Sequence, residues 1–210
     1  MGEDFPLMLD CYMSLTVPYA INLAHRLAPI GLKWMEEYLQ PDDYAGHAAV
    51  QQATQSLPVM LATAEHEYSR FGYKQLIDAR MVDILQPDIT WLGGITEARR
   101  VVAMASAAGI SVIPHGSSVF SYHLALASPS IPMSEFVTPA LDSIKPYFGG
   151  LFEGEPLPNR GSVDLGDAPG FGLTLLREGL VRPFEREQEW SRLNAAANIH
   201  FKEPPVRMKL

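Results

Sequence analysis

Short apolar runs alternate along this chain with longer amphipathic stretches, and five of the apolar runs end in an acidic residue or a histidine. These five residues follow one another at intervals of 23 to 29 positions and are Asp10, Glu36, Glu65, Asp88 and His115. Strands that alternate with helices in this way form βαβ units around a parallel sheet. Because a (β/α)8 barrel gathers the C-terminal ends of its strands in one mouth, the spacing predicts that the five side chains share a pocket.

The pattern predicts six strands with helices between them. Strands are expected at residues 5–10, 32–36, 59–64, 82–85, 110–114 and, as a short last run, at Glu135–Phe136. The first helix is expected to begin at Thr16, which can cap it, and to end before Gly31. Later helices are expected at residues 44–55, 70–80, 96–108 and 122–127.

The character of the chain changes after the sixth expected strand. Residues 139–184 are rich in Gly and Pro, which indicates loops with a short strand pair. Residues 185–210 form a charged tail that we expect to be partly helical. We therefore divide the chain into a barrel domain at residues 1–184 and a tail at residues 185–210.

The composition is that of a folded α/β protein and excludes several functions. The 210 residues are 47% hydrophobic and 19% charged, so they can bury a sizeable core. A complete barrel needs about 250 residues, so we expect a partial TIM barrel with about six of the eight strands. A net charge of −8 without a basic block argues against nucleic-acid binding.

Location is indicated only by what the sequence lacks. No apolar run approaches the length of about 18 residues that a membrane span requires, and the N-terminus does not have the pattern of a secretory signal. The single cysteine, Cys11, excludes an intramolecular disulfide and fits a reducing compartment. We expect a cytoplasmic protein that does not bind membranes.

Three of the strand-end carboxylates are candidate ligands of a divalent metal: Asp10, Glu36 and Glu65. A hard cation such as Mg²⁺ prefers oxygen ligands, and three carboxylates leave positions for substrate and water. One carboxylate at a strand end is more often a solvated loop residue, but three in register are not expected of random surface charge. Glu37 competes with Glu36, because side chains alternate along a strand and only one of the two points into the mouth. The other is expected to make a salt link behind the site.

Asp88 and His115 form a second pair, in which a carboxylate on one strand could orient an imidazole base on the next. The alternative is an unrelated aspartate and a loop histidine. His66 either contacts substrate or merely lies beside the metal ligands, and the sequence does not favour one of these. Gly93-Gly94 before a helix could bind a phosphate, but no phosphate-loop pattern surrounds it, so we favour a tight turn.

Several of these segments together resemble a known family. Glu65-His66-Glu67 with His115-Gly116-Ser117-Ser118 is the most specific combination, whereas Gly93-Gly94-Ile95-Thr96-Glu97 is widespread. The remaining matches are residues 2–11, 33–37, 41–44, 86–88 and 169–172. Over residues 2–184 the chain resembles the C-terminal catalytic portion of the enolase superfamily, and within it the mandelate racemase-like subgroup and the L-rhamnonate dehydratase family.

The resemblance implies a magnesium-dependent lyase of carbohydrate acid catabolism. Asp10, Glu36 and Glu65 would bind Mg²⁺, and the Asp88–His115 dyad would be catalytic. His115 would remove the proton α to the carboxylate of a sugar acid and assist loss of the 3-hydroxyl, which gives a 2-keto-3-deoxy acid. Glu135 would lie on the last strand near the substrate carboxylate. His66, next to Glu65, is the second candidate for substrate contact.

The resemblance also has departures and leaves alternatives open. Family members begin with a capping domain and two further barrel strands, and neither matches a segment of this sequence. Ala64 stands where glycine is common, and Tyr38 where many members have proline. The chain could instead be a galactonate-type dehydratase, an epimerase, a non-catalytic remnant, or one half of a split enzyme that a partner completes. Family members usually assemble, so a homo-oligomer is expected.

Overall fold

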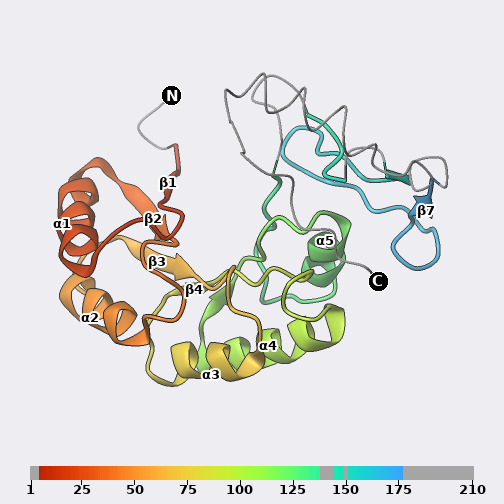
Figure 1. The fold of residues 1–210 in the computed structure, drawn as a ribbon. Helices are drawn as coiled ribbons and strands as arrows, with labels where there is room; N and C mark the ends of the chain where they lie inside the picture. The colour runs from red at the N-terminus through yellow and green to blue at the C-terminus, as the bar shows by residue number, and fades with distance from the viewer. Residues whose placement is uncertain (1–4, 138–143, 149–150, 177–210) are drawn as a thin grey trace, which may run out of the picture.

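Five parallel strands form the sheet on which the rest of the chain is built. The computed structural model describes residues 5–137, 144–148 and 151–176. The strands lie in sequence order, β1-β2-β3-β4-β5, and every neighbouring pair is parallel. Their bounds are β1 Leu7–Asp10, β2 Leu32–Glu36, β3 Met60–Thr63, β4 Ile84–Leu85 and β5 Ser111–Val112. The order is that of consecutive βαβ units, which confirms the partial barrel (Figure 1).

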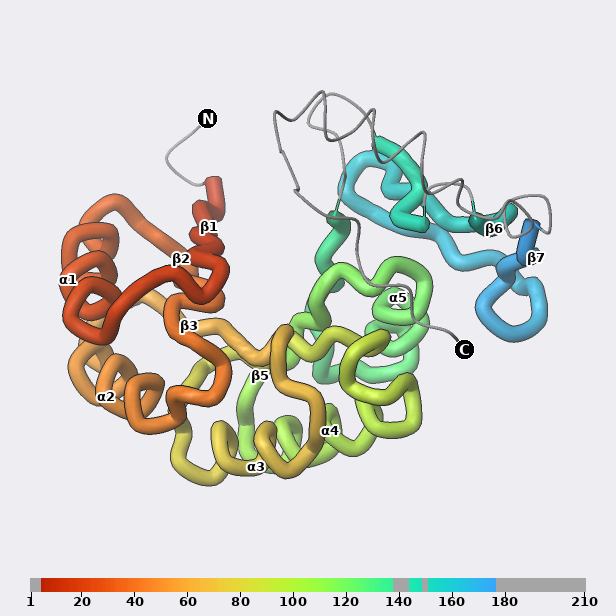
Figure 2. Tube along the Cα trace, viewed as in Figure 1, coloured from red at the N-terminus to blue at the C-terminus, as the bar shows by residue number. Residues whose placement is uncertain are grey.

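Helices connect the strands and lie along the outer side of the curved sheet (Figure 2). Their bounds are α1 Val17–Leu27, η1 Ala28–Ile30 (a 3₁₀ turn), α2 Tyr44–Thr54, α3 Arg70–Asp78, α4 Ile95–Ala108 and α5 Val119–Leu126. Consecutive helices touch: α1 contacts α2, α3 contacts α4, and α4 contacts α5. None of the helices in the described part of the chain is long and apolar enough to cross a membrane.

Local sequence signals explain where the helices begin and end. Thr16 stands at the N-cap of α1 as expected, but its side chain makes no capping hydrogen bond; Pro18 occupies the first turn. Pro29 lies in the η1 turn that follows α1, and Gly31 ends this turn with a φ of 78°, a conformation that glycine adopts at little cost. Asp43 caps α2 by accepting a hydrogen bond from the amide of Gly46.

The two faces of the sheet are covered differently. Met35 and Leu61 belong to a core cluster that includes the buried alanines of α1 and Val50 of α2. Alternate residues face the opposite side, where Trp34 and Ala62 belong to a smaller buried cluster. A third cluster joins the ends of β3 to β5 with α3, α4 and α5. Because side chains alternate along strands, the sheet is apolar on both faces, as parallel sheets generally are.

The expected sixth strand is wrong, since Glu135–Phe136 has no ladder partner in the described chain. The amide of Gly116 donates to the side chain of Glu135 instead of to a neighbouring backbone. A local sequence pattern cannot show whether such a segment has a neighbouring strand to pair with.

Beyond this point the described chain contains one antiparallel pair, β6 Phe152–Glu153 with β7 Thr174–Leu175. This confirms the short strand pair expected within residues 139–184. The tail at residues 185–210 lies outside the described residues, so its expected helix stays a prediction, as does the domain boundary at residue 184.

Candidate active site

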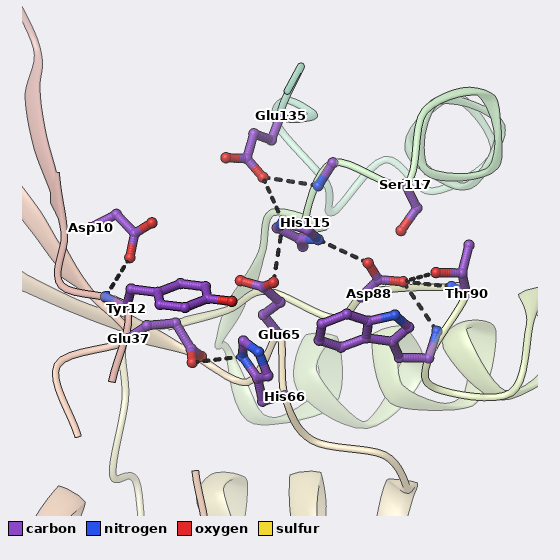
Figure 3. A network of polar contacts seen from close by, with 12 residues as sticks. Asp10, Tyr12, Glu37, Glu65, His66, Asp88, Thr90, His115, Ser117 and Glu135 are labelled. Atoms are coloured by element: carbon purple, nitrogen blue, oxygen red, sulfur yellow. Dashed lines mark hydrogen bonds and ion pairs between the residues drawn. The ribbon is translucent and has the colours of Figure 1, made fainter. Parts of the chain in front are cut away.

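The strand-end residues lie along one edge of the sheet. Asp10 and Glu36 are register partners at the last positions of β1 and β2. Glu65, Asp88 and His115 follow two or three residues after the ends of β3, β4 and β5. Parallel strands place these ends together, and Figure 3 shows Glu65, Asp88 and Glu135 around His115, with Asp10 farther away beside Tyr12.

The Asp88–His115 pair is present. The Nδ1 atom of His115 lies 2.9 Å from Oδ2 of Asp88. The other carboxylate oxygen accepts hydrogen bonds from the amide of Thr90 at 2.6 Å and that of Trp91 at 3.1 Å. Burial raises the pKa of Asp88, but hydrogen bonds from His115, Thr90 and neighbouring groups outweigh burial and bring the pKa down to about 2. Asp88 is therefore a charged acceptor that fixes the orientation of the imidazole.

The second nitrogen of His115 faces two further carboxylates. Its Nε2 atom lies 3.3 Å from Oε1 of Glu65 and 3.8 Å from Oε2 of Glu135. Burial lowers the pKa of His115, but the Asp88 hydrogen bond and the charges of Glu65 and Glu135 outweigh it and raise the value to about 9. Burial also raises the pKa of Glu65, to about 7. The imidazole thus lies among three acidic groups.

Glu37 and His66 form a second carboxylate–imidazole pair. Glu37 is fully buried, and its Oε2 atom lies 3.0 Å from Nδ1 of His66. Its other oxygen accepts hydrogen bonds from the Thr63 hydroxyl at 2.8 Å and the Ala64 amide at 3.0 Å. Of the two adjacent glutamates, Glu37 is therefore the one that contacts a histidine, whereas the salt link expected behind the site stays a prediction. His66 is held beside the cluster with its Nε2 side free of this link.

The carboxylates of the predicted metal site fit a hard cation by their chemistry. Glu36 and Glu65 are buried, and neither makes a salt bridge with lysine or arginine within the described ranges. Burial raises the pKa of Glu36, and the charges of Glu135 and Asp10 raise it further, against hydrogen bonds that lower it. Buried carboxylates normally have a compensating cation, and oxygen ligands suit Mg²⁺.

The three predicted ligands do not form a preformed metal site, however. No group of three His, Cys, Asp or Glu side chains in the described chain is placed to hold a metal ion. Asp10 is exposed, and its carboxylate accepts a hydrogen bond from the amide of Tyr12 at 2.8 Å. The metal-binding role of Asp10, Glu36 and Glu65 therefore stays a prediction.

Backbone strain is concentrated at the same edge. Glu37, Ala64 and Ser118 have φ values of 44°, 91° and 51°, although none of them is glycine. Such conformations cost about 1–3 kcal/mol each and cluster at functional sites. A left-handed φ at Ala64 also gives a physical reason for the glycine that the family commonly has there. The carbonyl of Ala64 is held by the Tyr73 hydroxyl at 2.6 Å.

Sequence reasoning missed two residues that touch the site. Thr90 and Trp91 both donate to Asp88, and the ring of Trp91 lies 6.5 Å from that of His115 between centroids. The side chain of an aspartate in a turn commonly accepts a hydrogen bond from the backbone two residues later, and this rule could have revealed Thr90. Gly93 and Gly94 follow with φ values of 98° and 89°, which fits the tight turn that we favoured.

Comparison with known proteins agrees with this geometry. A family model described as enolase C-terminal domain-like matches residues 1–179. The chain belongs to this family. An L-rhamnonate dehydratase of Saccharopolyspora erythraea is 43% identical over 190 residues, which are 89% of this chain and 48% of that protein.

Solved structures give the same picture. The rhamnonate dehydratase of Gibberella zeae, complexed with Mg, superposes with a TM-score of 0.79 at 43% identity, over 85% of this chain and 45% of that one. An L-talarate dehydratase from a Polaromonas species, complexed with Mg and L-glucarate, has a TM-score of 0.73 at 31% identity, over 84% of this chain and 46% of that one. The chain thus spans about half the length of the relatives that it matches.

Proposed function

We propose that this chain carries the catalytic residues of a Mg²⁺-dependent acid-sugar dehydratase that acts on L-rhamnonate. The observation that carries the proposal is the Asp88–His115 pair, with Nε2 of His115 turned toward Glu65. The name of the Saccharopolyspora relative, at 43% identity, supports the choice of substrate. The small-molecule substrate is thus a sugar acid.

His115 is the acid–base residue in this proposal. Asp88 binds Nδ1, so Nε2 of the neutral imidazole is the atom that takes the proton α to the carboxylate. A cation held by the neighbouring carboxylates would offset the negative charge that raises the pKa of His115 and would so favour this neutral form. The same nitrogen then returns a proton to the departing 3-hydroxyl, so the imidazole is regenerated and water is released. Asp88 stays charged throughout, because its hydrogen bonds keep its pKa low. Glu135 and His66 contact the substrate beside this nitrogen.

Asp10, Glu36 and Glu65 would hold the cation in this proposal. Bound there, Mg²⁺ supplies positive charge to the carboxylate of the acid, which makes the adjacent C–H bond more acidic. Without a cation, the acidic side chains would repel an anionic substrate. We further propose that the protein is cytoplasmic and works as a homo-oligomer.

The test is an assay of aldonic acids with Mg²⁺, in which the 2-keto-3-deoxy product is trapped as a semicarbazone. It uses this chain and a longer version to which the capping domain and the first two barrel strands of a family member are added. His115→Asn should abolish turnover in the active protein while Mg²⁺ still binds. Lys74→Ala is the matched control, because its exposed pair with Asp78 lies on α3, outside the site.

The outcomes separate the alternatives. Loss of water from L-rhamnonate supports the proposal, and full activity of His115→Asn would contradict the assignment of the base. Exchange of the α hydrogen with deuterium from solvent, without loss of water, would favour an epimerase. Activity of the longer version alone would support the split-enzyme interpretation, and no turnover from either would favour the remnant.

A further inference from the structure

Three exposed aromatic rings gather beside the dyad, and we call Tyr12, Tyr68 and Trp91 the aromatic platform. Their exposed fractions are 64%, 60% and 42%. Trp91 stacks on Tyr68 with 6.2 Å between centroids and 25° between planes. It also lies 4.8 Å from the ring of His66, which in turn lies 5.8 Å from Tyr12. The rings therefore form a connected surface across the site.

The strand-end aspartates fix the position of this surface. The amide of Trp91 donates to Asp88 at 3.1 Å, and the amide of Tyr12 donates to Asp10 at 2.8 Å. Two aromatic residues are thus tied through their own backbone to carboxylates of the site. Because the ring of Trp91 lies 6.5 Å from that of His115, a molecule that reacts at His115 must lie close to the indole.

The chemistry of the rings indicates what they bind. Most polar groups around His115 are acidic, so they favour the charged and hydroxylated end of a substrate only when a cation is present. The aromatic platform is instead largely apolar and uncharged. Aromatic faces carry a negative quadrupole and attract C–H groups with partial positive charge, such as those on the carbon chain of a polyol. Large exposed apolar surfaces commonly mark ligand-binding sites.

We propose that Trp91, supported by Tyr68, binds the carbon chain of the sugar acid beyond its reacting carbons and thereby selects long acids over short ones. This proposal rests on the proposed function, because it assumes that a sugar acid binds at His115. Trp91 is a binding residue here and takes no part in proton transfer. Its effect should therefore depend on the length of the acid.

The test compares two ligands by titration calorimetry on the full chain with Mg²⁺, with His115→Asn present in every variant so that L-rhamnonate is bound but not turned over. L-rhamnonate has a six-carbon chain, whereas lactate is a 2-hydroxy acid that ends one carbon beyond the reacting centre. Trp91→Ala should weaken binding of L-rhamnonate by about fivefold, since a ring contact is worth about 1 kcal/mol. Binding of lactate should change by less than about twofold, and Trp91→Phe should recover part of the loss.

Phe71→Ala is the matched control, because Phe71 is a 66% exposed aromatic residue whose ring contacts Arg70 rather than the site. It should leave both affinities unchanged. An unchanged affinity for L-rhamnonate in Trp91→Ala would overturn the platform, and so would an equal loss for both ligands, which would mean a distorted site. Failure of the chain with His115→Asn alone to bind L-rhamnonate, with lactate still bound, would contradict the proposed substrate and the platform together.

Discussion

Two fully buried tyrosines offer a matched test of how the strand ends are held. The hydroxyl of Tyr73 donates to the carbonyl of Ala64 at 2.6 Å, directly before Glu65. The hydroxyl of Tyr38 has no hydrogen-bond partner in the described chain. Replacing each by phenylalanine removes one oxygen from an equally buried place, so the two variants differ mainly in the hydrogen bond that is lost.

The expected effects differ in sign. Tyr73→Phe loses a buried hydrogen bond, which lowers the free energy of unfolding by about 1–2 kcal/mol. The loss stays moderate because the Ala64 carbonyl keeps a longer hydrogen bond from the amide of Glu67, at 3.4 Å. Tyr38→Phe removes an unpaired buried hydroxyl, so we expect stability to be unchanged or to rise by about 1 kcal/mol. The two variants should thus differ by about 2 kcal/mol.

Urea unfolding followed by circular dichroism measures the difference. The slopes should agree among the three proteins, so that the midpoints report stability alone. For a domain of this size, about 1 kcal/mol corresponds to a change of about 2–4 °C in Tm, which a thermal scan would detect. If Tyr38→Phe destabilised the protein as much as Tyr73→Phe, the inference from hydrogen bonding would be refuted.

Three further predictions concern other positions. Burial lowers the pKa of His47 from 6.5, against raising contributions from its hydrogen bond and nearby acids. The neutral form of His47 is therefore favoured in the folded protein, and stability is lost as the pH falls below about 6.5. Between pH 7.5 and 5.5, the urea midpoint of His47→Gln should fall less than that of the unaltered protein. Ala64→Val should lower the free energy of unfolding by more than about 2 kcal/mol, because a β-branched residue resists a positive φ. Ala64→Gly should change it by less than about 1 kcal/mol, since relief of strain offsets the lost methyl group. Urea unfolding of the two variants measures the difference. In Gly116→Ala the new Cβ would overlap the side chain of Val137, so Tm should fall by several degrees, whereas Gly166→Ala, which meets no atom within 4 Å, should leave it unchanged.

Much of the fold could be predicted because each parallel strand is a short apolar run with a helix after it. The expected strand at 32–36 and the expected helix at 44–55 agree with the structure to within one residue. The strand at Glu135–Phe136 failed because ladder pairing depends on neighbours distant in sequence, which a local pattern of residues cannot specify. The lengths of β4 and β5 were overestimated for the same reason, since only two residues of each strand are paired.

The site was predictable where it depended on strand ends and unpredictable where it depended on side-chain direction. The spacing correctly brought Asp88 next to His115. It could not show that Asp10 turns toward the amide of Tyr12, because that choice depends on a left-handed residue after the strand. Nor could it identify Trp91, whose place next to His115 follows from the turn after Asp88.

The carboxylate–imidazole pairs also connect the ends of neighbouring strands on the side of the sheet where the site lies. Glu37 after β2 holds His66 after β3, and His115 after β5 reaches back to Glu65 and Asp88. The ends of four consecutive strands, β2 to β5, are therefore linked to one another by contacts between side chains. A displacement of one strand end would therefore move the neighbouring strand end directly, through these side-chain contacts. We expect the strand ends around the site to move together when one of them is substituted. A substitution of Glu37 should therefore alter the position of His115.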